Sequence, residues 1–393
     1  MTPPAISPTE RSVLTPLLNK PATVKSILVF RIGSLGDMLI SLPAMWAVRN
    51  QFPNARITLL CDRQVGKKYV AGSDVLGGCA AIDDFLNYPV GGSKARRALE
   101  LGRLILQLRR RRYDLAVYLA PTVREPAQRK RDRFFFRLAG IRHIAGIDHY
   151  PAYPQKQPGV PLPHMPYEAD LLLQRLASDG ISVAPPGRGC MDLSLGQAEE
   201  REIAGWLSTL PNDGGRAWIG VGPGGKVPVN LWPIERYQAV VSRLIEQFDI
   251  WPVIFAGPDE RAAGDEMLKK WGRGYNAAGA LGVRASVAAL KRCQLHVGND
   301  TGTMHMASAA GTRCVGIYTS RQPPGIWWPY GSGHHVLRSD IDCEGCYLFT
   351  CIERGRECIL RSDVPQVTEA CARILGSAFS GDPGAWRAVH RNG

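Results

Sequence analysis

The stretch Ser26-Ile-Leu-Val-Phe-Arg31 runs directly into a loop that contains Gly33-Ser-Leu-Gly-Asp37. The first run is short, β-branched and aromatic, which predicts a buried β-strand. Residues 38–51 then show helical apolar spacing, and residues 56–61 predict a second strand. Strand, glycine loop, helix and strand form one βαβ unit, so the sequence predicts a parallel sheet.

The same pattern restarts in the second half of the chain. A strand is expected over residues 217–221, followed by the glycine loop Gly222-Pro-Gly-Gly225, a helix over 234–248 and a strand over 251–256. Two successive α/β halves of this kind predict two Rossmann-like domains, each with a parallel sheet, that face each other across a cleft.

The expected domain boundaries follow from composition. The proline-rich residues 151–166 predict a loop, and Val183-Ala-Pro-Pro-Gly-Arg-Gly189 has the composition of a linker. We therefore expect an N-terminal tail, two Rossmann-like domains and a C-terminal tail, over residues 1–25, 26–185, 186–375 and 376–393.

Composition excludes several classes of protein. The chain has 393 residues, of which 45% are hydrophobic and 21% charged, so it is not largely disordered. A net charge of +13 favours anionic partners, namely phosphorylated small molecules, nucleic acid or an anionic membrane surface. No apolar run reaches the roughly 18 residues that cross a bilayer, and no secretory signal is evident, so we expect a cytoplasmic protein.

Ligands of open α/β sheets bind beyond the carboxyl ends of the strands, where helix N-terminal amides face an anion. The loop Gly33–Asp37 satisfies this rule but lacks the dinucleotide fingerprint. In one interpretation Gly36 allows a ligand to approach closely and Asp37 directs its carboxylate at that ligand. In the other, Asp37 is only an acidic residue that is favourable in the first turn of a helix.

Two loops of the second half satisfy the same rule. Gly225 and Lys226 end the first of them, where Lys226 could meet a phosphate or could be an ordinary exposed lysine. Asp259 and Glu260 follow the strand that ends at Ala256. These carboxylates could bind ribose hydroxyls, or they could simply begin a helix.

The segment Gly298-Asn-Asp300-Thr301-Gly302-Thr-Met-His305 is the most informative loop. Thr301 can cap the helix that follows, which leaves amides for a diphosphate. Asp300 would repel phosphate, so we expect it to fix the loop or to meet sugar hydroxyls. His305, one turn into the helix, could donate to a phosphate oxygen.

Together these loops resemble glycosyltransferase family 9, the ADP-heptose:lipopolysaccharide heptosyltransferases and their relatives. The resemblance covers residues 26–375 and rests on Gly36-Asp37 with Pro43, on Trp232-Pro233, and on the two loops 257–260 and 298–305. It implies a GT-B fold and an inverting, metal-independent transfer of a heptose from ADP-heptose to a hydroxyl of a lipopolysaccharide core or another glycan acceptor.

The resemblance also implies roles for individual residues. Asp37 corresponds to the catalytic base of the acceptor-binding domain, in which Gly36, Arg124 and Arg129 are the expected acceptor-binding residues. The expected donor-binding residues are Gly225, Lys226, Asp259, Glu260, Asp300, Thr301, Gly302 and His305.

One position departs from the family pattern. Many members have a lysine two residues before the Trp-Pro pair, where this chain has Asn230. Lys226 could reach the same phosphates, but the donor nucleotide and sugar stay open. Two alternatives therefore remain, a GT-B epimerase or hydrolase that acts on a nucleotide sugar, and a sugar-nucleotide-binding protein that has lost turnover.

Four clustered cysteines, Cys343, Cys346, Cys351 and Cys358, allow two interpretations. They could form a structural zinc or iron site, or they could be free or disulfide-linked thiols. Six other cysteines lie in or beside apolar stretches and are expected to be buried thiols: Cys61, Cys79, Cys190, Cys293, Cys314 and Cys371.

Arginines concentrate at residues 109–112 and 124–133, next to Phe134-Phe-Phe136. This region could be a solvated helix face, or it could contact a phosphorylated lipid-linked acceptor or an anionic membrane surface, which would make the protein peripheral on the inner face of the cytoplasmic membrane. No nucleic-acid partner is expected, since no nucleic-acid-binding module is evident. Neither the acceptor nor the oligomeric state can be read from the sequence.

Overall fold

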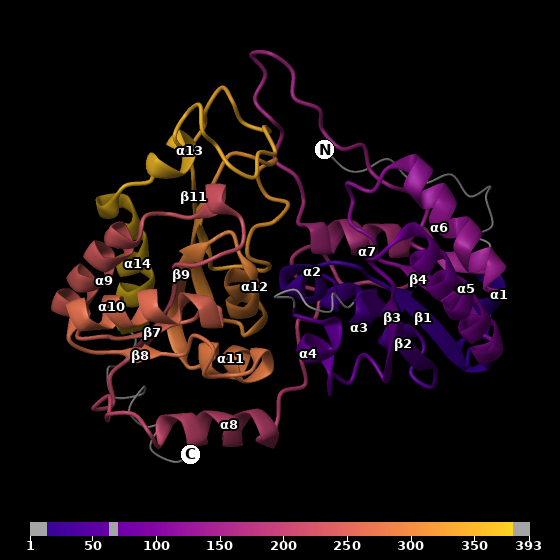
Figure 1. The fold of residues 1–393 in the computed structure, drawn as a ribbon, viewed down its shortest axis with the longest axis horizontal. Coiled ribbons are helices and arrows are strands. Elements are labelled where there is room, and N and C mark those ends of the chain that lie inside the picture. The colour runs from indigo at the N-terminus through magenta and orange to yellow at the C-terminus, as the bar shows by residue number, and fades with distance from the viewer. Residues whose placement is uncertain (1–13, 63–69, 380–393) are drawn as a thin grey trace. The chain divides into compact units, whose positions relative to one another are not determined.

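The computed structural model describes residues 14–62 and 70–379. Contacts within the chain divide it into two compact units (Figure 1). Unit 1 comprises residues 1–153 and 168–190, and unit 2 comprises residues 154–167 and 191–393.

Unit 1 is built on a five-stranded parallel sheet with the strand order β3-β2-β1-β4-β5. Its strands are β1 (Ser26–Phe30), β2 (Arg56–Asp62), β3 (Asp84–Tyr88), β4 (Leu115–Tyr118) and β5 (Ile144–Ala145). The predicted strand at Ser26 is thus confirmed as the central one. Its residues Ile27 to Phe30 are all buried, as expected for a strand that helices cover on both faces.

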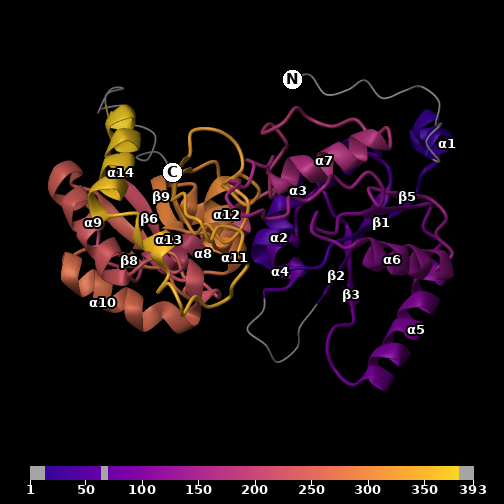
Figure 2. The same ribbon diagram turned by 90° about the horizontal axis from the view of Figure 1, so that it is seen from above.

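Helices of unit 1 lie on both sides of this sheet, with α5 and α6 on one side and α3 and α7 on the other (Figure 2). The helices are α1 (Thr15–Asn19), α2 (Leu35–Ile40), α3 (Leu42–Gln51), α4 (Gly72–Leu76), α5 (Lys94–Arg111), α6 (Pro126–Leu138) and α7 (Glu168–Ser178). The single helix expected over residues 38–51 is two helices that meet at Ser41. Pro43 explains the break, because proline lacks an amide hydrogen and is tolerated only in the first turn of a helix.

Unit 2 contains a six-stranded parallel sheet with the order β11-β10-β9-β6-β7-β8. The strands are β6 (Trp218–Gly222), β7 (Trp251–Ile254), β8 (Tyr275–Asn276), β9 (Cys293–Asn299), β10 (Arg313–Tyr318) and β11 (His335–Arg338). The helices are α8 (Gln197–Leu207), α9 (Ile234–Phe248), α10 (Arg261–Trp271), α11 (Val283–Leu290), α12 (Gly302–Ala309), α13 (Glu357–Leu360) and α14 (Val364–Phe379), with 3-10 turns at Pro228–Asn230 and Pro258–Glu260. The core packs Val221, Val297 and Ile317 of the sheet against Val240 and Val367.

Residues 154–167 pack in unit 2, although the expected boundaries place them in the first domain. The backbone amide of Leu162 donates to the buried carboxylate of Glu344 at 2.5 Å. The amide of Met165 donates to the carbonyl of Pro324 at 2.8 Å. These hydrogen bonds fasten an extended segment that has no helix or strand of its own.

Five of the six thiols expected to be buried are buried, and Cys190 is the exception because it is exposed. Cys190 is the last residue of unit 1 before the chain enters unit 2, so neither core covers it. In the part of the chain that the structure describes, no helix combines the length and the apolar character that crossing a bilayer requires.

Two phenylalanines of α6, two positions apart, provide a matched test of the core of unit 1. Phe136 is fully buried and contacts Phe30, with ring centroids 5.6 Å apart, whereas Phe134 is 62% exposed. We expect Phe136→Ala to lower the free energy of unfolding by about 3–5 kcal/mol, because it opens a cavity. Phe134→Ala should change it by less than about 0.5 kcal/mol. Urea denaturation followed by circular dichroism measures both, and similar losses would contradict the packing described.

Candidate functional site

Each sheet has one point at which its strand order reverses. In unit 1 the reversal lies between β1 and β4, and in unit 2 it lies between β6 and β9. The loops that leave neighbouring strands diverge at such a point, which leaves a crevice at the carboxyl ends of the strands. The predicted loop Gly33–Asp37 follows β1, and the loops at Gly222 and Asp300 follow β6 and β9, so sequence reasoning placed them at both reversals.

Asp37 is held rigidly at the start of α2. The amide and the hydroxyl of Ser34 donate to its Oδ2 at 2.8 and 3.0 Å, so Asp37 does cap the helix. Arg31, whose side chain is fully buried, donates from Nη2 to Oδ1 at 2.8 Å. A carboxylate offers about four lone-pair sites. These three contacts therefore leave one site on a side chain that is 25% exposed.

Glycines shape this loop around the carboxylate. Gly33 has φ +149°, and a Cβ atom there would lie 2.5 Å from Cγ of Asp37, so only glycine fits. The amide of Gly33 donates to Oδ1 of Asp62 at 3.0 Å, which ties the loop to the end of β2. Gly36, the predicted point of ligand approach, is buried within α2.

The two arginines predicted to bind the acceptor differ in how far they are engaged. Arg124 forms an ion pair with the buried Asp132 at 2.6 Å, so its guanidinium is already bound by a carboxylate of unit 1. Arg129 lies over the ring of Tyr150 at 4.3 Å, and its Nε is buried and has no hydrogen-bond partner in the described residues. Arg175 stacks on the same ring at 4.0 Å. Two guanidinium groups thus stack on the ring of Tyr150.

In unit 2, Glu260 joins two of the predicted donor loops. Its Oε1 accepts the amide of Gly225 and its Oε2 accepts the amide of Gly257, each at 2.7 Å. A Cβ atom on Gly224 would lie 2.0 Å from Oε1, so that glycine makes room for the carboxylate. Lys226 and Asp259 are exposed on the same two loops.

Asn299 joins the third loop to the first. Its side chain is fully buried and donates to the carbonyl of Pro223 at 2.8 Å. Its Oδ1 accepts the amide of Trp232 at 3.0 Å and the hydroxyl of Tyr237 at 2.8 Å. No local sequence pattern predicts these contacts, because an asparagine at the end of a strand has many ordinary functions.

Asn230, which departs from the family pattern, is buried beside Asp300. Its Nδ2 donates to the backbone carbonyl and to Oδ2 of Asp300 at 3.1 and 3.3 Å, while Thr319 donates to its Oδ1 at 3.0 Å. Burial raises the pKa of Asp300 to about 7, and the nearby Arg321 only partly opposes this increase. The hydrogen bond from the neutral amide of Asn230 also lowers this pKa, but burial outweighs it.

Thr301 occupies the N-cap position of α12, as predicted, but its side chain does not cap the helix. The hydroxyl lies 3.0 Å from the hydroxyl of Thr303 instead. The first amides of α12, beginning with Gly302, are thus left without a side-chain cap, and such amides bind anions. His305 is buried one turn further along the same helix. Gly225 adjoins this loop, since its Cβ would lie 2.6 Å from Cγ2 of Thr301.

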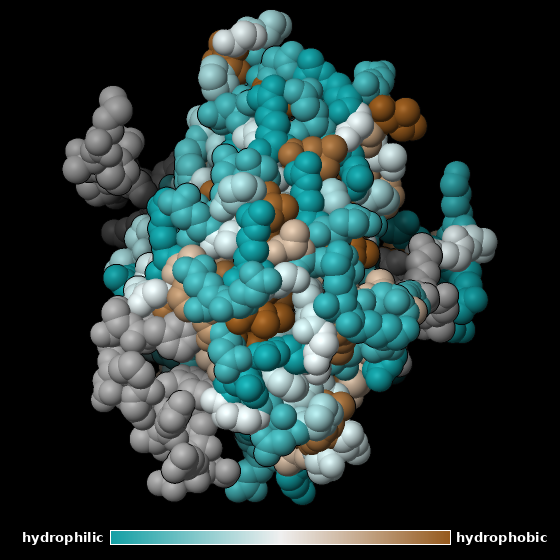
Figure 3. All heavy atoms as spheres, turned by 90° about the vertical axis from the view of Figure 1, so that its left-hand side faces the viewer, coloured by the Kyte–Doolittle hydropathy of each residue, from teal (hydrophilic) through white to brown (hydrophobic). Residues whose placement is uncertain are grey.

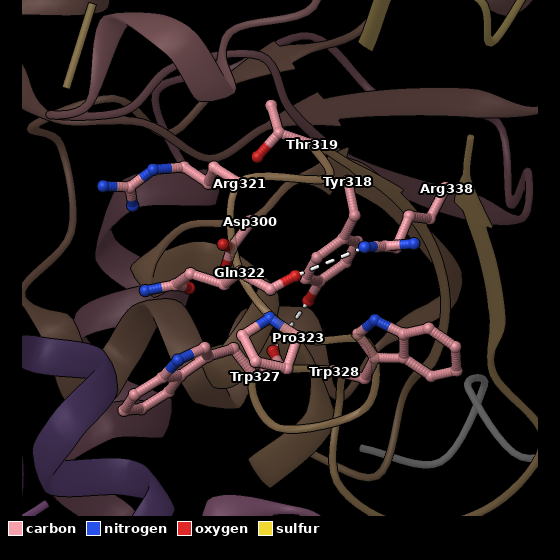
Figure 4. Close-up of a pocket in the computed structure, with 9 residues that line it drawn as sticks. All are labelled: Asp300, Tyr318, Thr319, Arg321, Gln322, Pro323, Trp327, Trp328 and Arg338. Carbon is pink, nitrogen blue, oxygen red and sulfur yellow. Dashed lines mark hydrogen bonds between the residues drawn. The ribbon is translucent and has the colours of Figure 1, made fainter. Parts of the chain in front are cut away.

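A hollow in unit 2 contains Asp300 together with residues that sequence reasoning missed (Figure 4). They come from the end of β10 and the segment after it: Tyr318, Thr319, Arg321, Gln322, Pro323, Trp327, Trp328 and Arg338 of β11. The rule that selected the other loops also selects residues 319–322, since they follow a parallel strand. The tryptophans carry no comparable signal.

The four clustered cysteines line a second hollow in unit 2, together with Val229 and Arg321. All four are free thiols, and burial raises the pKa of Cys358. Across residues 14–62 and 70–379, no group of three or more histidine, cysteine or acidic side chains is arranged to hold a metal ion. The structural zinc or iron site considered from the sequence is therefore unsupported.

Comparisons with known proteins agree with this description. Residues 191–356 match the family model described as glycosyltransferase family 9 (heptosyltransferase). Lipopolysaccharide heptosyltransferase 2 of Escherichia coli K12 is 24% identical over 324 residues, which are 76% of this chain and 83% of that relative.

Two solved structures share the fold over most of the chain. The glycosyltransferase family 9 protein of Veillonella parvula has a TM-score of 0.70 and 19% identity, over 90% of this chain and 98% of that one. The ADP-heptose lipopolysaccharide heptosyltransferase II of E. coli has a TM-score of 0.63 and 18% identity, over 90% and 99%. The predicted GT-B type α/β fold is thus confirmed. The resemblance is confirmed as well: residues 191–356 match the family model, and curated lipopolysaccharide heptosyltransferases are 24% and 26% identical to this chain, which supports a glycosyltransferase.

Proposed function

We propose that this protein is an inverting heptosyltransferase. It transfers a heptose from a nucleotide sugar of the ADP-heptose type to a hydroxyl of a lipopolysaccharide core or a related glycan. Unit 2 would bind the donor and unit 1 the acceptor. One observation carries the donor side, namely that Glu260 and Asn299 join three loops beside the uncapped N-terminus of α12. The names of the relatives supply the heptose and the lipopolysaccharide.

Stabilisation of the leaving diphosphate is the main task of unit 2 in this proposal. The bond from the anomeric carbon to the diphosphate oxygen breaks, and that oxygen gains negative charge. The first amides of α12, with His305 and Lys226, would stabilise this charge without reorganisation. Glu260 keeps free lone pairs for ribose hydroxyls even with both oxygens accepting amides.

Asp300 would face the sugar rather than the phosphates. It lines the hollow with Trp327 and Trp328, and sugar rings stack well on aromatic faces. A carboxyl group with a pKa of about 7 can accept a hydrogen bond from a sugar hydroxyl when ionised and donate one when protonated. The protonated state avoids a negative charge beside the diphosphate.

Asp37 would be the general base. Its remaining lone pair accepts the proton of the acceptor hydroxyl while that oxygen bonds to the anomeric carbon, on the face opposite the departing diphosphate. Arg31 and Ser34 hold the carboxylate in one orientation, which general-base catalysis requires. Arg129, whose Nε is unpartnered in the described residues, would attract an anionic group of the acceptor, whereas Arg124 is already paired with Asp132.

Product analysis tests the proposed reaction. With ADP-heptose and a heptose-deficient lipopolysaccharide, we expect heptosylated acceptor and free ADP in equal amounts, measured by mass spectrometry. Among ADP-, GDP- and UDP-linked sugars, the ADP-linked donor should raise the Tm most, because a ligand that binds the native state stabilises it. A donor altered without acceptor would indicate an epimerase or hydrolase, and binding without any product would indicate a binding protein.

Replacement of the base separates chemistry from folding. Asp37→Ala should lower kcat by about 10²–10⁴-fold and leave the donor Kd unchanged. Asp74→Ala is the matched control, because Asp74 caps the short helix α4 in the same way, with Oδ2 3.1 Å from the amide of Ala71. It removes the same kind of cap contact and should keep its turnover, although Asp37→Ala should lose more stability because it also removes the partner of the buried Arg31. Equal loss of turnover in both variants would show that Asp37 acts only as a cap.

Asp300 makes the stability of unit 2 depend on pH. Because its pKa in the folded protein, about 7, lies above the ordinary value of 3.8, the native state binds this proton more tightly than the unfolded state. Stability from this group is therefore lost as pH rises toward 7. Ligand-free Asp300→Asn should be more stable than the wild type at pH 8 by about 1–3 kcal/mol, and this difference should shrink as the pH falls to 5 and vanish only below the ordinary pKa of 3.8. Thermal unfolding at both pH values measures this, and a pH-independent difference would refute it.

A further inference from the structure

Helices α5 and α6 present their outer faces on the same side of unit 1. Leu104 and Leu108 of α5 and Phe136 of α6 are buried in one core cluster against the sheet. Both helices therefore cover the same face of the sheet, opposite α3 and α7 (Figure 2). Their C-terminal ends lie close together, since a Cβ on Gly140 would lie 3.8 Å from Cγ of Arg109.

Large apolar side chains project from these outer faces. Leu99 and Leu106 of α5 are 56% and 55% exposed, and Phe134 and Leu138 of α6 are 62% and 42% exposed. The spacing is helical in both cases, because residues 99, 103, 106 and 110 form one stripe and residues 130, 134 and 138 form another. Exposed apolar residues clustered in this way commonly mark an interaction site.

Cations flank every one of these apolar residues. The two helices carry twelve lysines and arginines but only two acidic residues, so they supply +10 of the chain's net charge of +13. Arg103 and Arg110 flank the leucines of α5, and Lys130 and Arg137 flank the apolar residues of α6. Among the described residues these four cations form no ion pair, whereas the inward Arg124 and Arg133 do.

We propose that this face, defined by Leu99, Arg103, Leu106, Arg110, Lys130, Phe134, Arg137 and Leu138, binds an anionic lipid surface. The cations would lie among the lipid head groups while Phe134 and Leu138 enter the boundary with the acyl chains. The inference deepens the proposed function and rests on it in one respect, since a lipid-linked acceptor lies at such a surface and binding there raises its effective concentration.

Two other occupants fit the face less well. A second copy in a twofold contact would place the same cations opposite one another. The eight residues that define the face include no acidic side chain that could pair with them. A nucleic acid would pair with the cations but would leave Phe134 and Leu138 facing a phosphate backbone. By contrast, the face of unit 2 drawn in Figure 3 is mostly hydrophilic, with hydrophobic residues in small separate groups.

Flotation of the full chain with lipid vesicles tests the proposal. Vesicles of phosphatidylcholine with 30% phosphatidylglycerol should bind the protein at least about tenfold more strongly than pure phosphatidylcholine, and added salt should weaken the binding. Phe134→Ser with Leu138→Ser should lower the partition coefficient by at least about tenfold. The matched control is Phe349→Ser with Ile352→Ser, which removes side chains of unit 2 that are 60% and 85% exposed and should leave binding unchanged.

Each other outcome overturns the inference. Equal binding to neutral and anionic vesicles, or wild-type binding by the Phe134 and Leu138 variant, would exclude the face. A molar mass in light scattering that differs between the wild type and the Phe134 and Leu138 variant would assign the face to a second copy of the chain. Binding of a single-stranded oligonucleotide that the serine substitutions leave unchanged would assign the face to nucleic acid. Turnover on a soluble, delipidated acceptor separates the two proposals. If the wild-type protein shows no turnover on that acceptor, the transferase proposal is refuted. If it shows turnover but does not bind vesicles, only the lipid-binding face is refuted.

Discussion

All strands of both sheets run parallel, and this constraint determines where chemistry can occur. Each connection must return across the sheet through a helix or an extended segment, so the carboxyl ends of all strands of a sheet lie along one edge. The strand order then reverses once in each unit, between β1 and β4 and between β6 and β9. The loops that diverge at these two points hold Asp37 in one unit and Asp300 in the other. The positions of these candidate site residues thus follow from chain topology, and the side chains refine them.

Carboxylates perform that refinement by binding backbone amides. Asp37 accepts the amide of Ser34, and Glu260 accepts those of Gly225 and Gly257. In these contacts, some lone pairs of each carboxylate accept hydrogen bonds from loop amides and so hold the loops in place. In return the remaining lone pairs point in fixed directions, so no reorganisation is needed when a ligand arrives. The structural and the functional interpretations of these acidic residues are therefore compatible.

Much of this arrangement could be predicted from the sequence, because strand, glycine loop and helix are local patterns with a general rule for where ligands bind. The central strand, the four loops and the family followed from those patterns. Contacts between distant residues could not be predicted in the same way. Nothing near Asn230 in the sequence indicates that its amide contacts Asp300, seventy positions later. Likewise, nothing near Arg124 indicates that Asp132 pairs with it. The hollow with Trp327 depends on how the segment after β10 folds back. The break at Ser41 is the exception, because Pro43 is a local signal for it, yet the apolar spacing alone predicts one continuous helix.

The path of residues 154–167 has a practical consequence for dividing the protein. The backbone crosses from one unit to the other three times, at 153–154, 167–168 and 190–191, so no single cut yields two intact halves. A fragment beginning at Met191 would lack residues 154–167, and with them the contacts of Leu162 and Lys156 with Glu344. Of the partners described for that carboxylate, Arg338 would remain. An isolated fragment of unit 2 should thus carry residues 154–167 on a designed linker. A circular permutation that starts at residue 154 would still have to carry residues 168–190 within it.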